Sequence, residues 1–289
     1  IIIIMYSGYR TIELPFKQQT KRFDFRGFTL LAGILVALSL AVNQAGQSGI
    51  ASWRFITILL IGLVLIGILI VLNQHGQFNL LNLSILKDRT ILLSSLVYFF
   101  LQFTNIGISF VIPVLAQNTL KTTSMVAGLI LLPGSLLGAI VAPLAGRLYD
   151  RKGFFLPVLL SNLSLLLGTW LFYILTDDLT VVLITVIYVF LRVGFNLGFG
   201  NLLSDASKQV TSEHKPDLNS LFNTLQQYAG SMGTGVLAAV IADQELQPQS
   251  LAIATQTGSQ RDFLVLVGLS CFNVIAVLMI QHWKQSVKN

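Results

Sequence analysis

The stretch LAGRLYDRKGFF, residues 144–155, decides how the chain folds, because it sets a cluster of charges between two long uncharged runs. Four ionisable residues fall within six positions: Arg147, Asp150, Arg151 and Lys152. Gly146 and Gly153 stand on either side, and glycine permits the sharp reversal that a tight turn needs. We therefore expect a charged turn that joins two helices, and the medium around those helices determines what the turn does.

The composition indicates that this medium is lipid. Hydrophobic residues make up 54% of the 289 residues and charged residues only 10%, and the mean hydropathy is +0.77. An average soluble domain carries about 25% charged residues, so this chain has too few to cover a surface that faces water. A membrane protein is therefore predicted, and it requires apolar runs of about 20 residues.

Eight such runs are present, and seven of them hold no Asp, Glu, Lys or Arg apart from Arg54 at one margin. The sixth holds a single charge, Arg192, near its middle. The runs are Gly27–Gly46, Trp53–Asn73, Thr90–Gln117, Thr122–Gly146, Gly153–Thr176, Leu179–Ser204, Leu218–Ala242 and Phe263–Trp283. Membrane β-strands alternate with a period of two over about 10 residues, so these runs do not fit them. The predicted fold is an all-α integral membrane protein with eight transmembrane helices.

The net charge of +6 follows a topological pattern. If the helices alternate and the chain starts inside, fourteen Lys and Arg residues lie on the cytoplasmic side and three on the opposite side. The fourteen are Arg10, Lys17, Lys21, Arg22, Arg26, Lys87, Arg89, Arg147, Arg151, Lys152, Lys208, Lys215, Lys284 and Lys288. The three are Arg54, Lys121 and Arg261. We therefore expect a multi-pass plasma-membrane protein with both termini cytoplasmic, and no nucleic-acid partner.

The sequence offers no constellation for catalysis or for a cofactor. His75, His214 and His282 lack metal-ligand spacing, Cys271 stands alone, and there is no Walker-type glycine loop. No Asp or Glu falls within any predicted span. A membrane-embedded enzyme would need acids, histidines or a cysteine at one depth. We therefore predict a protein that is not an enzyme and that holds no cofactor or metal.

The chain divides into three parts. Residues 1–22 are predicted to be the remnant of a preceding helix, IIIIMYSGYR, and a polar cytoplasmic linker, although Met5 also reads as a start. Residues 23–89 hold two helices joined by a short loop, and Asp24 is placed to cap the first of them. Residues 90–289 hold the six remaining helices as one bundle.

Small residues recur on one face of two predicted helices. They are Gly134, Gly138 and Ala142 in the fourth span, and Gly230, Thr234 and Gly235 in the seventh. In lipid, small residues let two helices approach closely. Packing within this bundle and an interface with a second bundle both explain the pattern.

Polar side chains mark two other spans at helical spacing. They are Tyr98, Gln102, Asn105 and Ser109 in the third span, and Tyr188, Arg192 and Asn196 in the sixth. Uncompensated polar groups are costly in hydrocarbon, so both stripes should face protein or water. For the amides, interhelical hydrogen bonding and a solute pathway are both open, whereas a charge at the membrane centre favours a function for Arg192.

The charged turn resembles the signature loop of the major facilitator superfamily, G-x-L-x-D-R-x-G, at Gly146, Leu148, Asp150, Arg151 and Gly153. Three more segments are similar to the fourteen-helix drug:proton antiporters of the EmrB/QacA type. They are FDFRGFTLL (residues 23–31), IPVLAQNTLKTTSMVAGLILLPGSL (112–136) and LNSLFNTLQQYAGSMGTG (218–235). The four segments stand in the order that this family has.

The resemblance implies two six-helix bundles with two additional helices between them, of which this chain holds the additional pair and the C-terminal bundle. The absent N-terminal bundle would be a partner and would carry the acid for proton coupling. The third and sixth spans would line the central cavity, and the fourth and seventh would face the opposite bundle. Asp150, just before the N-terminus of the next helix, would act in gating. Because an unpaired charge in the membrane is costly, we expect either that a carboxylate of the absent bundle pairs with Arg192 or that Arg192 bonds only to backbone carbonyls and waters.

The implied function is that of the C-terminal part of a proton-coupled multidrug efflux transporter, which exports amphipathic small molecules by alternating access. Two alternatives stay open. One is a transporter of a dedicated metabolite on the same scaffold, and the other is a non-transporting membrane fragment that associates with another half.

Overall fold

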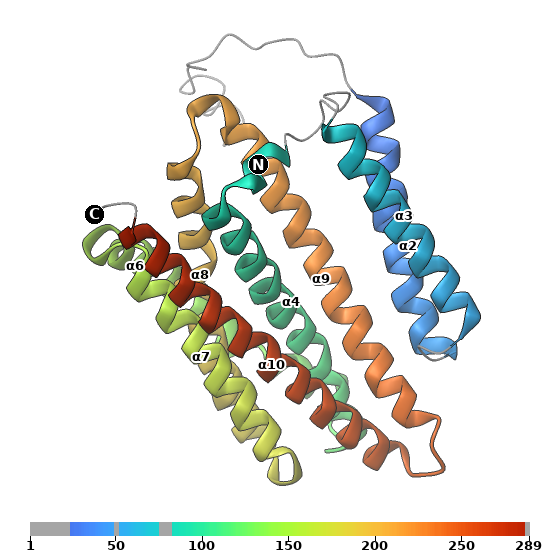
Figure 1. The fold of residues 1–289 in the computed structure, drawn as a ribbon. Helices are drawn as coiled ribbons and strands as arrows, with labels where there is room; N and C mark the ends of the chain where they lie inside the picture. The colour runs from blue at the N-terminus through green and yellow to red at the C-terminus, as the bar shows by residue number, and fades with distance from the viewer. Residues whose placement is uncertain (1–23, 49–51, 75–82, 287–289) are drawn as a thin grey trace, which may run out of the picture.

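The computed structural model describes residues 24–48, 52–74 and 83–286, and within these every regular element is a helix. The α-helices, labelled as in Figure 1, are α2 (Phe25–Ser48), α3 (Trp53–Gln74), α4 (Arg89–Asn118), α5 (Ser124–Leu129), α6 (Leu132–Lys152), α7 (Phe155–Ile174), α8 (Val181–Gln209), α9 (Lys215–Glu245) and α10 (Leu251–Ser286). Short 3-10 helices lie between them: η1 (Leu83–Lys87), η2 (Thr176–Asp178) and η3 (Ser212–His214). The prediction of an all-α protein is confirmed. The predicted remnant and linker at residues 1–22 lie outside the described residues.

Seven of the described helical segments are long and apolar enough to cross a membrane, with α5 and α6 counted as one. The helix α9 corresponds to the seventh predicted span, Leu218–Ala242, but it does not meet this criterion of length and hydropathy. It is 31 residues long, but amide side chains such as Asn219, Asn223, Gln226 and Gln227 lower its hydropathy. The multi-pass membrane character is thus supported, with α9 as the most polar of the long helices.

Local side-chain signals set where helices begin. The Asp88 carboxylate caps α4, because its Oδ1 accepts hydrogen bonds from the N–H groups of Thr90 at 2.7 Å and Ile91 at 3.1 Å. At the start of α2, Asp24 Oδ1 accepts from the N–H of Gly27 at 2.9 Å, as the sequence predicted. Both carboxylates also lie where the helix dipole favours an anion.

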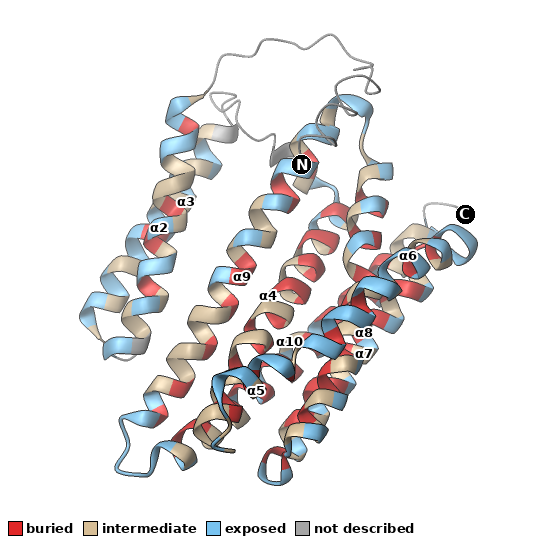
Figure 2. Cartoon of the chain, turned by 180° about the vertical axis from the view of Figure 1, so that it is seen from behind, coloured by how far each residue is buried: buried red, intermediate tan, exposed pale blue. Residues whose placement is uncertain are grey.

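α4 lies at the centre of the bundle, with α8, α9 and α10 packed against it (Figure 1). α8 in turn packs against α6 and α7, and α10 also contacts α7 and α9. In Figure 2 the buried residues follow α4 and the faces that its neighbours turn towards it. Large side chains fill this core, among them the fully buried Phe172, Phe222 and Phe263.

The hairpin of α2 and α3 stands at one side of the bundle, and α2 contacts α9 (Figure 1). α3 exposes a long series of large apolar side chains: Trp53, Ile56, Leu60, Ile61, Leu63, Val64, Ile68, Ile70 and Val71. A water-soluble monomer rarely exposes so much contiguous apolar surface. The hairpin therefore has the surface of a helix pair that faces lipid on its outer side.

Several helices run past the ends that the sequence predicted, and in two of them the extension includes a buried acid. α8 continues to Gln209, and α10 starts at Leu251 rather than at Phe263. The predicted runs themselves hold no Asp or Glu, but the helices are longer than the runs, and Asp205 and Asp262 fall inside α8 and α10, where both are buried. A hydrophobic run ends at its first charge, whereas a helix continues where neighbouring helices bury that charge.

Candidate functional site

The signature turn joins α6 to α7. Gly153 ends α6 with a φ of 76°, in the left-handed region that favours glycine, and its N–H donates to the Tyr149 carbonyl at 2.8 Å. Asp150 and Arg151 are exposed in the last turn of α6, and Leu148 is partly buried. The predicted reversal is therefore made at Gly153, whereas Gly146 lies inside α6 and takes no part in it, and the turn presents its charges to the surroundings.

Asp150 does not cap the next helix, contrary to the position expected for it. α7 begins at Phe155, and the residue before it, Phe154, makes no capping hydrogen bond through its side chain. Asp150 belongs instead to the C-terminal turn of α6, where the helix dipole disfavours an anion. No ion pair within the described ranges involves its carboxylate. Its charge is thus available to a partner outside these helices.

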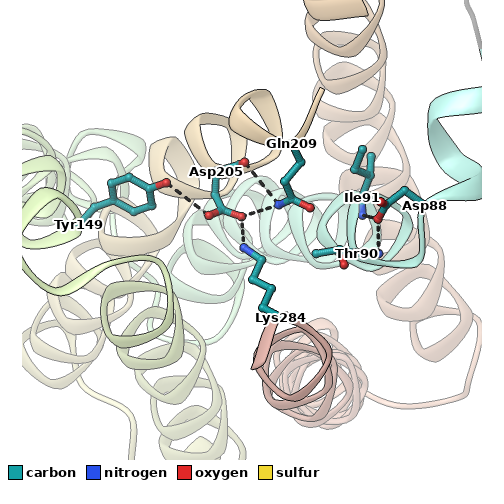
Figure 3. A network of polar contacts seen from close by, with 7 residues as sticks. All are labelled: Asp88, Thr90, Ile91, Tyr149, Asp205, Gln209 and Lys284. Carbon is teal, nitrogen blue, oxygen red and sulfur yellow. Dashed lines mark hydrogen bonds and ion pairs between the residues drawn. The ribbon is translucent and has the colours of Figure 1, made fainter. Parts of the chain in front are cut away.

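Beside the signature turn, Asp205 joins three helices (Figure 3). Its Oδ1 accepts a hydrogen bond from the Tyr149 hydroxyl at 3.3 Å, and its Oδ2 accepts one from Gln209 Nε2 at 2.7 Å. The Lys284 ammonium forms an ion pair with the same Oδ2. Only 8% of Asp205 is exposed, and a carboxylate at such depth needs these compensating partners. We call Tyr149, Asp205, Gln209 and Lys284 the anchor cluster, because it ties α6, α8 and α10 together.

Aromatic rings hold the cations of this region. Lys284 Nζ lies 4.0 Å from the ring centre of Phe154, and Lys208 Nζ lies 4.4 Å from that of Tyr149. The anchor cluster was not predicted, because the sixth uncharged run ends at Ser204, one residue before Asp205. One signal was available: Gln209 follows Asp205 by four residues, the spacing at which side chains meet on a continuing helix.

The two polar stripes predicted on the third and sixth spans meet each other across α4 and α8. Arg192 Nη1 donates a hydrogen bond to Asn105 Oδ1. One helical turn away, the hydroxyls of Ser109 and Tyr188 share a hydrogen bond of 3.2 Å. The expectation that the stripes face protein holds for these four residues, which we call the polar seam.

The other stripe residues point elsewhere. Tyr98 donates its hydroxyl hydrogen to Gln226 Oε1 on α9 at 3.1 Å, and Asn196 Nδ2 donates to the Arg192 carbonyl at 2.8 Å. Gln102 is buried, and its Oε1 has no hydrogen-bond partner among the described residues. The seven stripe residues, on spans expected to line one cavity, are therefore divided: four form the seam and three face other surroundings.

Arg192 is partly buried and has no carboxylate partner within the described residues. Its Nε is buried without a hydrogen bond, and its guanidinium carbon lies 5.4 Å from the ring centre of Phe195. A cavity of about 10 Å³, lined by Thr104, Asn105 and apolar neighbours, adjoins the guanidinium. That space is about the size of one water molecule. The charge is therefore held by one amide and one ring, without a counter-ion from this part of the chain.

The small-residue faces have partners within the chain. A Cβ atom on Gly134 would lie 2.7 Å from the Tyr188 ring, and one on Gly138 would lie 2.4 Å from Asn196 Nδ2, so both glycines make room for α8. On α9, Gly230 and Gly235 are packed against other helices, α4 and α2 respectively. Gly233, which was not singled out, comes close to the backbone of another helix, with its Cβ position 2.5 Å from the Phe103 carbonyl oxygen on α4.

Ala142 and Thr234 differ from these glycines. Ala142 is exposed on α6, and Thr234 is only partly buried on α9. An interface with a second bundle therefore stays a prediction for these two positions, whereas contacts inside the chain account for the four predicted glycines.

Within the described ranges, no group of three His, Cys, Asp or Glu residues is arranged to hold a metal ion. Cys271 is exposed on α10 and belongs to neither the signature turn nor the polar seam. The candidate site thus consists of the signature turn, the anchor cluster and the polar seam. The anchor cluster and the polar seam link helices through hydrogen bonds and charge pairing, and the signature turn presents charges at a helix end.

Long apolar helices with polar contacts between them and a charged turn are features of a helical membrane protein. Residues 23–234 match the Major Facilitator Superfamily, and the chain belongs to that superfamily. Members of this superfamily are transporters, not enzymes.

Several proteins are similar to this chain. Lincomycin resistance protein LmrB of Listeria monocytogenes is 23% identical over 256 residues, which cover 84% of this chain and 54% of LmrB. Multidrug resistance protein Stp of Mycobacterium tuberculosis is 26% identical over 240 residues, covering 83% of this chain and 44% of Stp. Riboflavin transporter RibZ of Clostridioides difficile is 23% identical over 255 residues, covering 83% of this chain and 52% of RibZ. The chain thus spans about half the length of the curated relatives it matches.

Proposed function

We propose that this chain is the C-terminal part of a fourteen-helix, proton-coupled exporter of the EmrB/QacA type, which moves amphipathic small molecules outward by alternating access. The observation that carries the proposal is the polar seam, in which Arg192 meets Asn105 between two apolar helices. A charge at membrane depth is rare and marks a solute or ion pathway. Two of the similar proteins, LmrB and Stp, are named for drug resistance.

In this proposal a second six-helix bundle completes the transporter. The Arg192 guanidinium forms no ion pair among the described residues, and the second bundle supplies a carboxylate for it. α6 supports a docking role, because Leu136, Ile140 and Leu144 are exposed beside Ala142. The half-length match to the relatives agrees with a partner bundle of comparable size.

Asp150 is the proposed gating residue. Its exposed carboxylate lies at the end of α6 without an ion pair in the described residues, so a helix N-terminus or a cation of the second bundle can bind it. Such a contact exists when the bundles close at the signature turn and is lost when they separate there. Asp150 therefore stabilises one of the two alternating states.

The proposed location is the plasma membrane, with the signature turn and both termini on the cytoplasmic side. The excess of Lys and Arg on that side supports this orientation. A cysteine at Ser212, an exposed position on η3, should then resist an impermeant thiol reagent added outside the cell. Labelling of this cysteine from outside would contradict the proposed orientation and favour the opposite one.

A transporter for a dedicated metabolite is the second candidate, and the observation in its favour is the similarity to RibZ, a riboflavin transporter. In a drug exporter, the complete protein should lower the accumulation of lincomycin and of cationic dyes in cells, and collapse of the proton gradient should abolish this. Export of riboflavin alone would favour the second candidate. If the complete protein moved no solute, the remaining alternative would be a membrane fragment that does not take part in transport.

A further inference from the structure

Asp262 stands apart from the anchor cluster and the polar seam. It lies within α10, and its exposed fraction is 0%. Neither of its carboxyl oxygens has a hydrogen-bond partner among the described residues. Four residues earlier, Gly258 lies so close to α9 that a Cβ atom there would be 2.7 Å from the Ile241 Cα. The helices around this part of α10 are thus in close contact, and the carboxyl group is sealed between them.

Apolar packing also closes the site on the side of α7. The ring of Phe263, the next residue, stacks on Phe172 with centroids 4.9 Å apart and an interplanar angle of 17°. Ser259, one turn before Asp262, is fully buried as well, and its hydroxyl has no partner in the described residues. The Asp262 carboxyl group therefore lies in an enclosed setting in which no described residue donates a hydrogen bond to it.

No cation in the described part of the chain forms an ion pair with this carboxyl group. α10 packs against α4, α7 and α9, with smaller contacts to η2. The titratable or charged residues of these elements are Arg89 and Tyr98 on α4, Tyr173 on α7, Lys215, Asp217, Tyr228, Asp243 and Glu245 on α9, Asp177 and Asp178 on η2, and Arg261, Cys271, His282 and Lys284 on α10. The adjacent cation, Arg261, instead forms an exposed pair with Asp243 at 3.9 Å, and none of the described cations pairs with Asp262.

A carboxylate in such a place is far less stable than a neutral carboxylic acid, because the isolated charge loses its hydration and no hydrogen bond or ion pair replaces it. An ionised Asp262 would be a buried charge without a partner, like the charge that remains when one member of a buried ion pair is removed. The neutral form is therefore the form compatible with the observed packing.

We propose that Asp262 is a proton-binding site, which holds its proton while α10 is packed against α4, α7 and α9 and loosens this packing when the proton leaves. The exposed Arg261–Asp243 pair beside it shows that water is near, so a small separation of α10 suffices for exchange of the proton. The site lies far from the signature turn, because Asp262 is near the start of α10 and the anchor residue Lys284 near its end. Protonation thus controls closure at the end of the bundle that the anchor cluster does not hold. The link to proton-coupled export rests on the proposed function, whereas the proton itself can be observed without transport.

Infrared difference spectroscopy of the whole chain in lipid vesicles tests the protonation directly. At neutral pH the chain should show the carbonyl absorption of a protonated carboxylic acid, and Asp262→Asn should remove it. Asp205→Asn is the matched control and should leave the band intact, because Asp205 is paired with Lys284. Absence of the band from the unmodified chain, or its persistence in Asp262→Asn, would overturn the proposal.

A second measurement tests the effect on packing. The reporter is a chain with Cys271→Ser and Ser259→Cys, which has a single thiol beside Asp262. Labelling of this thiol should rise between about pH 6 and pH 9, and the rise should be several-fold larger than in the same chain with Asp262→Asn added. The asparagine has the shape of the neutral acid but cannot ionise, so its labelling reports only the ordinary titration of the thiol. Equal responses with and without Asp262 would overturn the loosening. If the complete protein fails to export drugs while the infrared band is present, the proposed function fails and the proton site stands.

Discussion

Asp205 and Asp262 are the same side chain in opposite surroundings. Asp205 receives two side-chain hydrogen bonds and a lysine, whereas Asp262 has no hydrogen bond or cation from the described residues. The first is therefore stable as a carboxylate and fixes three helices to one another. The second is stable as a neutral acid and responds to the proton concentration.

Lys284→Met should leave Asp205 as a buried anion without its cation. Because Lys284 and Asp205 retain side-chain exposures of 25% and 11%, water screens part of the loss, and we expect a destabilisation of roughly 1–3 kcal/mol. Unfolding by denaturant in detergent measures it, with the exposed Lys152→Met as control. Since apolar replacement of both partners is often neutral, Asp205→Leu should restore stability in the Lys284→Met chain. No loss in Lys284→Met would mean that the pair does not anchor α10.

Arg192→Gln should shift the pH dependence of transport in the complete protein. In the proposed arrangement Arg192 favours the ionised form of an acid on the other bundle, so without it that acid keeps its proton up to higher pH. The pH profile of efflux should therefore move towards higher pH, and Arg192→Lys should keep the original profile. A changed rate with an unmoved profile would leave Arg192 as a structural residue of the polar seam.

At the scale of elements, the helices themselves were more predictable than their ends. The uncharged runs located every long helix, because a helix in lipid needs about 20 apolar residues. The ends of α8 and α10 were wrong, because Asp205 and Asp262 are buried by neighbouring helices that a single run does not reveal. Side-chain spacing predicted the stripes of α4 and α8, and only the structure shows that Tyr98 turns to α9 instead.

The contact between α9 and α4 depends on Gly233. A Cβ atom there would lie 2.5 Å from the backbone oxygen of Phe103, so Gly233→Ala forces the two helices apart. We expect a destabilisation of about 1–3 kcal/mol, the usual range for overpacking. Gly268→Ala on α10 is the control, because its Cβ would meet open space, and it should be neutral or slightly stabilising. Thermal unfolding in detergent compares the two, and equal stability would show that α9 is free to move away from α4.

Asp150→Asn tests the signature turn as an element of gating. The exposed side chain makes no ion pair in the described residues, so the substitution should leave folding unchanged. In the complete protein it should slow efflux at least several-fold while equilibrium drug binding stays within about twofold, because the proposed contact acts on one closed state. Asp178→Asn, an exposed acid on η2, serves as control. Normal efflux by Asp150→Asn would end the gating role.

At the scale of the whole molecule, the family resemblance predicted which superfamily the chain belongs to, and the structure shows which helices pack together. Membership of the superfamily was foreseen from the signature turn at residues 146–153 and is shown by the match over residues 23–234. The position of α2 against Gly235 of α9 was not foreseen, because small-residue spacing does not name the partner helix. The division into an additional helix pair and a six-helix bundle stays a prediction.

The central claim is that this chain forms a proton-driven export pathway only together with a second six-helix bundle. Drug uptake into inverted membrane vesicles under an imposed proton gradient tests it most directly. Vesicles with this chain alone should show no gradient-driven uptake, and vesicles with the complete protein should accumulate drug until the gradient is collapsed. Gradient-driven uptake by the chain alone, or none by the complete protein, would contradict the claim.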